Sequence, residues 1–324
     1  MNVSTLTWIA TCAVILGLFL FDFVFNARKP HAPSFKESAT WSVVYIALAV
    51  IFGLYVIWQW GGTYGGEYFA GYVTEKALSV DNLFVFTIIM TSFAVPREHQ
   101  QKVLLIGIVL ALVMRAGFIA VGAAAINTFS WVFYLFGIFL IYTAIKLARE
   151  SGHEEEVEEE RDSKIVALAK RFLPTVDHYD GGKLTTRIDG KRFVTPMFLA
   201  LVAIGFTDIL FALDSIPAIY GLTTEPYIVF AANAFALMGL RQLYFLIGGL
   251  LDRLVYLSYG LSLILAFIGV KLVLHALHEN TLPFINGGEH IMVPEISTGM
   301  SLSVIGAVLA VTTVASLIKS RATR

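Results

Sequence analysis

Apolar segments long enough to cross a lipid bilayer recur along most of this chain. A membrane-spanning helix needs about 20 predominantly apolar residues. Nine segments fit that length and composition: 5–25, 41–60, 68–95, 103–123, 129–147, 197–220, 227–249, 255–276 and 299–318. Charged residues make up 15% of the 324 residues, whereas soluble proteins typically have about 25%. The segments therefore predict an all-α fold, a polytopic membrane protein with about nine transmembrane helices.

The loops that join these segments alternate in their content of lysine and arginine. Loops 61–67, 124–128, 221–226 and 277–298 contain neither residue, whereas each of the loops between them contains at least one. Cytoplasmic loops of membrane proteins are enriched in Lys and Arg. We therefore expect the N-terminus outside the cell and the C-terminus in the cytoplasm, and the alternation favours the count of nine.

The segments divide the chain into five parts. These are residues 1–67 (two N-terminal helices), 68–147 (a three-helix unit), 148–196 (a cytoplasmic loop), 197–276 (a second three-helix unit) and 277–324 (an outer loop and the last helix). In the cytoplasmic loop, the acidic run 154–160 predicts a solvated helix end, although it could also attract cations. Residues 163–173 predict a short amphipathic helix, and the Asp189-Gly190 pair predicts a hairpin turn.

The two three-helix units align loosely with each other. The matching pairs are Asp81 and Asp214, Arg115 and Arg241, and Lys146 and Lys271. Because each unit has an odd number of helices, the second unit must cross the membrane in the opposite direction to the first. We therefore predict an inverted repeat, an architecture common among secondary transporters, whose binding site lies between the repeats near the middle of the membrane.

Each unit carries two acidic residues, six positions apart, inside an apolar segment. A carboxylate in the middle of a bilayer costs roughly 2.5–3.5 kcal/mol, so such residues mark functional sites. An amide or hydroxyl residue follows the second acid of each pair. The candidate ligands all offer oxygen atoms, and they are Glu75, Asp81, Asn82, Asp208, Asp214 and Ser215. Oxygen ligands favour Mg²⁺, Ca²⁺ or Mn²⁺ over Cu⁺ or Zn²⁺.

The six-residue spacing does not place the two acids of a unit on one helix face, because six residues turn an α-helix by about 240°. The predicted site therefore needs either a local break in a helix or ligands drawn from both units. Pro217 is the candidate for such a break, since proline removes a backbone donor and frees the Leu213 carbonyl beside Asp214.

Other charged residues allow a structural interpretation. Three basic residues in the apolar segments are expected to form ion pairs: Arg115, Arg241 and Lys271. Glu75 stands beside Lys76, near the predicted outer surface, and pairing explains it as well as metal binding does. Asp22, at the inner end of the first segment, is interpreted as structural. A weaker metal candidate surrounds the outer loop, and ordinary loop polarity explains it equally well: His275, His278, Glu279, Glu289, His290 and Glu295.

Three stretches resemble the TerC family of bacterial integral membrane proteins, which includes the Alx-type manganese exporters. They are EKALSVDNLFVF (75–86), TDILFALDSIPAIYGLT (207–223) and NAFALMGLRQLYFLIGG (233–249), and the resemblance extends from the second to the ninth segment. It implies a multi-pass protein of the bacterial cytoplasmic membrane that exports Mn²⁺ through the six oxygen-bearing residues above. Members are often also labelled as tellurium-resistance proteins. Many relatives have Glu where this chain has Gly205.

We therefore expect a metal-ion transporter that exports Mn²⁺ by alternating access, with no enzymatic activity and no bound cofactor. A carboxylate in a low-dielectric site can exchange a proton for a cation, so proton coupling is one way to drive efflux. The expected partners are a divalent metal ion and membrane lipid, with a secretion-machinery protein or a second copy of the chain left open. The net charge of −1 provides no basic surface for nucleic acid.

Two other function classes remain open for this sequence. One is a membrane interaction protein that supports metal delivery to secreted proteins, or resistance to tellurite and other stress. The other is a membrane redox enzyme, which would need a cofactor or paired cysteines, whereas this chain has only Cys12.

Overall fold

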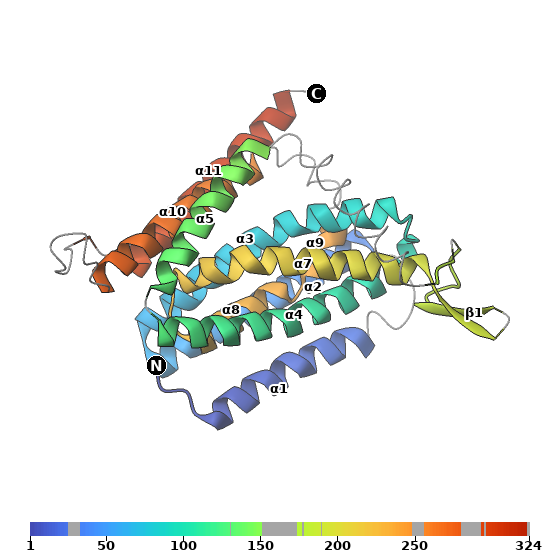
Figure 1. Cartoon of the computed structure of the whole chain (residues 1–324), viewed down its shortest axis with the longest axis horizontal. Coiled ribbons are helices and arrows are strands. Elements are labelled where there is room, and N and C mark those ends of the chain that lie inside the picture. The colour runs from blue at the N-terminus through green and yellow to red at the C-terminus, as the bar shows by residue number, and fades with distance from the viewer. Residues whose placement is uncertain are drawn as a thin grey trace.

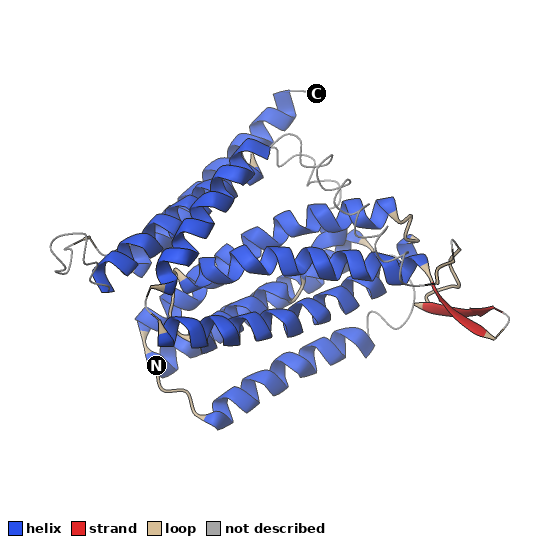
Figure 2. Ribbon diagram, viewed as in Figure 1, coloured by secondary structure: helices blue, strands red, loops and turns tan. Residues whose placement is uncertain are grey.

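Most helices of the chain run roughly parallel or antiparallel to one another, with a small hairpin at one end of the bundle that they form (Figures 1 and 2). This computed structural model describes residues 1–24, 33–129, 131–150, 174–176, 178–188, 190–247, 256–279, 293–294 and 296–322. The helices are α1 (Thr5–Asp22), α2 (Phe35–Trp60), α3 (Gly62–Ser92), α4 (Arg97–Thr128), α5 (Val132–Glu150), α7 (Pro196–Tyr220), α8 (Pro226–Leu237), α9 (Leu240–Ile247), α10 (Leu257–Glu279) and α11 (Thr298–Ala322). The hairpin consists of β1 (Thr185–Ile188) and β2 (Lys191–Val194).

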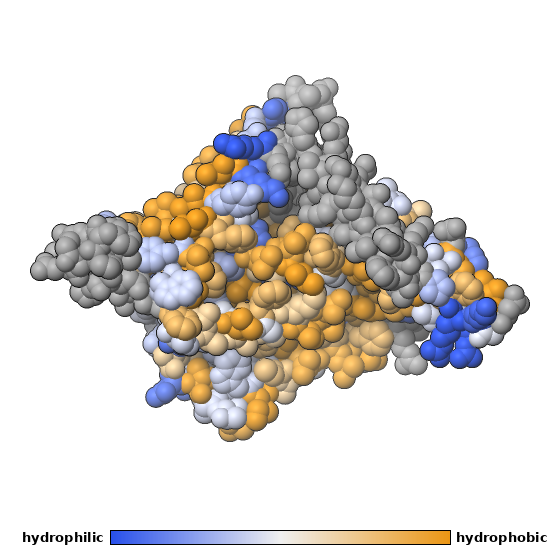
Figure 3. Space-filling model, viewed as in Figure 1, coloured by the Kyte–Doolittle hydropathy of each residue, from blue (hydrophilic) through white to orange (hydrophobic). Residues whose placement is uncertain are grey.

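Most of these helices are long and apolar enough to cross a membrane. Within the described residues there are eight such spans, one of which combines α8 and α9 as Pro226–Leu246. The outer helices expose large apolar side chains. In α11, only 17% of an apolar stretch of 18 residues is buried. Figure 3 shows apolar side chains over the flanks of the helices and hydrophilic ones at the hairpin end. The chain is an all-α polytopic membrane protein.

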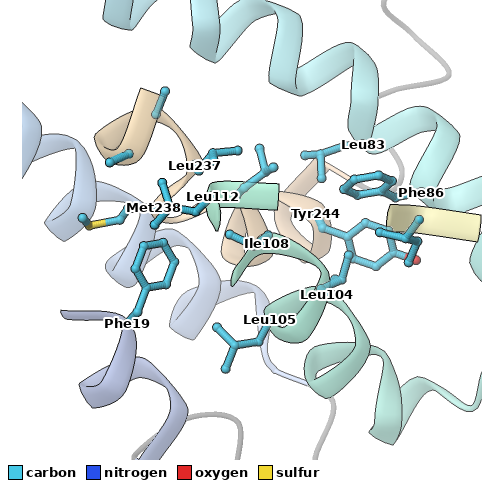
Figure 4. Packing of buried hydrophobic residues seen from close by; sticks show 14 of the residues in the cluster. Phe19, Leu83, Phe86, Leu104, Leu105, Ile108, Leu112, Leu237, Met238 and Tyr244 are labelled. Carbon is cyan, nitrogen blue, oxygen red and sulfur yellow. The ribbon is translucent and has the colours of Figure 1, made fainter. Parts of the chain in front are cut away.

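The predicted third segment, 68–95, corresponds to α3, which is 31 residues long. This helix is not among the eight spans, and its charged residues account for that. It packs against α2, α7, α8 and α11, so its polar positions have protein neighbours. Leu83 of α3, Ile108 of α4 and Tyr244 of α9 belong to one buried apolar cluster (Figure 4). The count of nine spans stays a prediction.

Helices α5, α10 and α11 run together at an angle to the other helices (Figure 1). α5 and α10 come unusually close to each other, because glycines face one another across their interface. A Cβ atom added at Gly137 would lie 2.8 Å from the carbonyl oxygen of Gly269, and one at Gly269 would lie 2.9 Å from that of Gly137. Small residues allow helix backbones to approach in this way within membranes.

The neighbours of the helices follow the order that the repeat predicts. α3 packs against α8 while α4 packs against α7, and α5 packs against α10. Exchanging the first unit (α3, α4, α5) with the second (α7, α8–α9, α10) leaves this set of neighbours unchanged. The contacts are what a repeat would produce, and the inverted repeat itself stays a prediction.

A helix break is present, but the prediction that it lies at Pro217 is wrong. α7 continues through Pro217 to Tyr220, because one missing hydrogen bond does not end a helix that is buried along its last turn. The break lies between α8 and α9, where Gly239 has a φ of +75°. Glycine suits this left-handed conformation, and a Cβ here would also lie 3.0 Å from Cβ of Tyr45.

The predicted cytoplasmic loop, residues 148–196, is described only in part. β1 and β2 pair in an antiparallel hairpin, with Arg187 opposite Arg192, where the Asp189-Gly190 pair predicts a turn. Asp189 itself, the acidic run 154–160 and the predicted helix 163–173 lie outside the described residues.

Candidate functional site

A buried arginine lies at the centre of the bundle and joins four helices. Arg115 of α4 has no solvent exposure. Its guanidinium forms two ion pairs, with Glu75 of α3 and with Asp208 of α7. It also donates to Asn233 Oδ1 of α8 at 3.0 Å and to Ser215 Oγ of α7 at 3.3 Å. The residues that converge here thus come from both predicted units.

The contact between Arg115 and Asp208 is a two-point contact. Nη2 lies 3.2 Å from Asp208 Oδ1 and Nε lies 3.4 Å from Oδ2. The planar guanidinium matches the carboxylate in this geometry. Both acids are buried, with Glu75 completely hidden and Asp208 only 2% exposed. Two carboxylates therefore share one guanidinium.

Three buried polar atoms around these acids have no hydrogen-bond partner in the described part of the chain. Glu75 Oε1 accepts from Arg115 and from Ser79 at 3.2 Å, but Glu75 Oε2 has no partner. The hydroxyls of Thr74 and Thr207, which precede Glu75 and Asp208 in the sequence, are also buried and unpartnered in the described part of the chain. A buried polar atom without a partner costs about 1–3 kcal/mol, so the unpartnered Glu75 Oε2 beside Arg115 favours a polar or ionic occupant.

Thr74 and Thr207 were not identified from the sequence, although a signal for them exists. Each stands directly before the first acid of its unit, and each is completely buried. An alignment of the two acidic motifs extended by one residue would have paired them.

Three of the six predicted ligands contact Arg115 in the described part of the chain. Glu75, Asp208 and Ser215 meet at Arg115. Asn82 is buried on α3 at 5% exposure. Asp214 is half-buried on α7, and its charge interacts with those of Arg115 and Glu75.

The side chain of Asp81 lies outside the described residues, although its backbone belongs to α3. In the described part of the chain, no three His, Cys, Asp or Glu side chains are arranged to hold a metal ion. Arg115 occupies the position between the two acids, and the six-residue metal site stays a prediction.

The other basic candidates have separate surroundings. Arg241 of α9 is 4% exposed, and its Nη2 lies 2.7 Å from Asp22 Oδ1 of α1. Its Nη1 donates to Gln101 Oε1 of α4 at 2.6 Å. Lys271 of α10 donates to Ser301 Oγ of α11 at 3.1 Å. Arg115 and Arg241 thus each form a buried ion pair, whereas Lys271 contacts a hydroxyl.

A cavity of about 420 Å³ lies at the end of the bundle where α7 ends and α11 begins. Glu67, Lys271, His275 and His278 are among its lining residues, and Thr223 donates to Glu67 Oε2 at 2.6 Å. Two histidines of the predicted outer-loop cluster therefore line a cavity. The other members of that cluster lie outside the described residues or have side chains that do: Glu279, Glu289, His290 and Glu295.

Gly205 lies one helical turn before Asp208 on α7. A Cβ at this position would lie 3.0 Å from Leu110 Cδ2 of α4. The position therefore faces α4, and a larger side chain would have to displace Leu110.

Comparison with known proteins identifies the family to which the sequence is similar. A family model described as "Integral membrane protein TerC family" matches residues 60–324. An uncharacterized membrane protein of Mycobacterium tuberculosis is 54% identical over 99% of this chain and 81% of its own length. One of Myxococcus xanthus is 40% identical over 97% and 92%, respectively. A protein of Photorhabdus laumondii with the provisional name membrane-bound redox modulator Alx is 36% identical over 84% and 87%. No solved structure matches the chain.

Proposed function

This chain belongs to the TerC family of integral membrane proteins, and we propose that it exports Mn²⁺ from the cytoplasm by alternating access. The observation that carries this proposal is the convergence of Glu75 and Asp208, from different units, on one buried arginine. Residues this costly to bury within a membrane mark ion pathways. Transporters with repeated units hold their cargo between the repeats, and these two acids come from the two predicted units.

The guanidinium of Arg115 takes the place between the two carboxylates that a transported Mn²⁺ ion would occupy. Without a divalent cation, its guanidinium compensates part of the charge of Glu75 and Asp208. An entering Mn²⁺ would replace it between the two carboxylates, where Glu75 Oε2 has no partner among the described residues. The half-buried Asp214 adds a further carboxylate beside this cluster. Because the guanidinium and Mn²⁺ would exchange places, Glu75 and Asp208 would have a positive partner both with and without the metal ion.

Uptake of Mn²⁺ into inverted membrane vesicles tests the proposal, since export from the cell becomes uptake in that orientation. We expect Glu75→Gln, Asp208→Asn and Asp214→Asn each to abolish uptake. Asp180→Asn, which changes an exposed acid of the cytoplasmic loop, is the matched control and should leave uptake unchanged. Wild-type rates in Glu75→Gln and Asp208→Asn, with the proteins present in normal amounts, would show that the site is assigned wrongly.

The ion and the membrane are parts of the same proposal. We propose the bacterial cytoplasmic membrane, with the C-terminus in the cytoplasm, and transport without catalysis. Competition by Mg²⁺, Ca²⁺ and Zn²⁺ during uptake measures the selectivity, and oxygen ligands predict that Zn²⁺ competes poorly. Growth of a deletion strain with excess Mn²⁺, Ca²⁺, Mg²⁺ or tellurite identifies the ion that the cell needs to export. Flux in liposomes that contain only the purified protein separates a transporter from an interaction protein.

The name of the Photorhabdus relative favours a second candidate, a role in membrane redox balance. Such a role requires an electron carrier, and the chain has one half-buried cysteine, Cys12. An optical spectrum of the purified protein decides between the two, because a bound haem or flavin absorbs visible light. A spectrum without such bands, together with Mn²⁺ flux, leaves transport as the function.

A further inference from the structure

Lys76 follows Glu75 on α3, but its side chain serves a different part of the bundle. Its Nζ donates to the carbonyl oxygen of Ala236 at 2.9 Å and to that of Met238 at 3.1 Å. Both carbonyls lie at the break between α8 and α9. The side chain is only partly buried by surface area, yet its ammonium contacts backbone oxygens within the bundle. Lys76 therefore does not act as a simple partner of Glu75.

The break explains why these oxygen atoms are free to bind. The last four carbonyls of any α-helix have no partner within the helix, and α8 ends at Leu237. Gly239 then turns the chain before α9 begins. The C-terminal end of a helix also carries a partial negative charge. Free carbonyls at membrane depth are tolerated only where something satisfies them.

Such broken helices bind ions in other membrane proteins. In transporters with discontinuous helices, unwound carbonyls and the C-terminal ends of half-helices coordinate the coupling cation. We propose that the α8–α9 break is a monovalent-cation site, formed by the carbonyls of Ala236 and Met238, and that the ammonium of Lys76 is its resident occupant.

The chemistry of the ligands separates this site from the acid cluster. Carbonyl oxygens are neutral ligands, which suit a singly charged ion, whereas protein sites for divalent cations include carboxylates. The resident ammonium also fixes the break to α3. α8 contributes Asn233 to the surroundings of Arg115, and α9 contributes Arg241 to the pair with Asp22. Lys76 is thus a positioning residue for the element that connects the surroundings of Arg115 with those of Arg241.

Chemical rescue of Lys76→Ala tests this site with a probe that resembles the missing group. Thermal unfolding of the purified variant is measured in methylammonium chloride and in tetramethylammonium chloride at equal concentration, with a chelator present to remove divalent ions. We expect methylammonium to raise the unfolding midpoint of Lys76→Ala by about 2 °C or more. Tetramethylammonium should have no such effect because it has no N–H group to donate.

Two further proteins serve as controls. The wild type should not respond to methylammonium, because its site is already occupied. Lys76→Met should not respond either, since its side chain fills the same space without a charge. Equal midpoints of Lys76→Ala in the two salts would overturn the proposal. A response of Lys76→Met as large as that of Lys76→Ala would do so too, because the probe would then bind elsewhere.

The proposal can also be tested if Lys76→Ala does not accumulate in the membrane. If Lys76→Ala is lost, Lys76→Arg and Lys76→Met are compared by their amounts in the membrane. The site requires the arginine variant, which keeps the charge and its N–H donors, to accumulate several-fold above the methionine variant. Equal amounts would refute the site. None of these measurements uses Mn²⁺, so their failure would leave the proposed transport function untouched.

Discussion

Replacing Arg115 by methionine removes the guanidinium and leaves two carboxylates buried without a positive partner. The side chains have similar lengths, so the substitution mainly removes charge and hydrogen bonds. Arg115 has no solvent exposure, and it donates to Glu75, Asp208, Ser215 and Asn233. Water cannot compensate for its loss at this depth, so the full effect should be visible in the stability of the protein.

The expected loss follows from the burial of the partners. Removing one member of a buried ion pair destabilises a protein by about 3–5 kcal/mol, because an uncompensated charge remains. One kcal/mol lowers the unfolding midpoint of a large domain by roughly 2 °C. We therefore expect the midpoint of Arg115→Met to fall by roughly 6–10 °C. Tryptophan fluorescence of the purified protein during heating measures this shift.

A triple variant shows whether charge is the cause. Combining Arg115→Met with Glu75→Gln and Asp208→Asn leaves amides of nearly the same shape in place of the unpaired carboxylates. The triple variant should regain more than half of the stability that the single variant loses, since no buried charge remains. The reasoning is refuted if Arg115→Met unfolds within about 2 °C of the wild type, or if the triple variant is no more stable than the single one.

Other sites in the structure give further predictions. Arg241→Met should lower the free energy of unfolding by about 3 kcal/mol in the same assay, because its acidic partner in α1 is buried as well. Gly137→Ala should destabilise by about 1–3 kcal/mol through crowding at α10, whereas the same change at Gly306, which has open space around it, should be neutral or slightly stabilising. A hydrogen bond from Lys183 lowers the pKa of the exposed Asp180 carboxyl. Its contribution to the loop is therefore complete above the ordinary Asp pKa of about 3.9 and is lost as the pH falls through the lower native value, which an NMR titration of the carboxyl measures.

The positions of the helices were largely accessible from the sequence, but their ends were less so. The apolar segment 103–123 lies within α4, which begins at Arg97 and continues to Thr128. A search for about 20 consecutive apolar residues finds only the apolar part of a helix. It misses the polar residues that continue the same helix beyond that part. The segment 41–60 likewise begins after the start of α2, where Ser34 Oγ accepts from the backbone N–H of Glu37. That capping signal was present in the sequence.

The candidate site was accessible only in part, because its geometry depends on which helices lie side by side. Glu75 was placed near the outer surface, with pairing and binding equally open, yet it is fully buried next to an arginine 40 residues away in sequence. No local pattern reports that distance. The break between α8 and α9 left one sequence signal, the lone Gly239 within an apolar run. Nothing local to Gly239 indicates that Lys76, more than 150 residues earlier, binds the carbonyls that this break frees.

The charged residues of α3 have a consequence for the order in which the protein is made. A lysine or an acid at the centre of a lone helix opposes insertion by roughly 2.5–3.5 kcal/mol, and α3 contains both. Its arginine partner is synthesised with the next helix, but the carbonyls that bind Lys76 follow 160 residues later. While those 160 residues are being made, α3 therefore has a charged group whose final neighbours do not yet exist. We expect it to stay beside the insertion machinery, away from lipid, until α8 has been made.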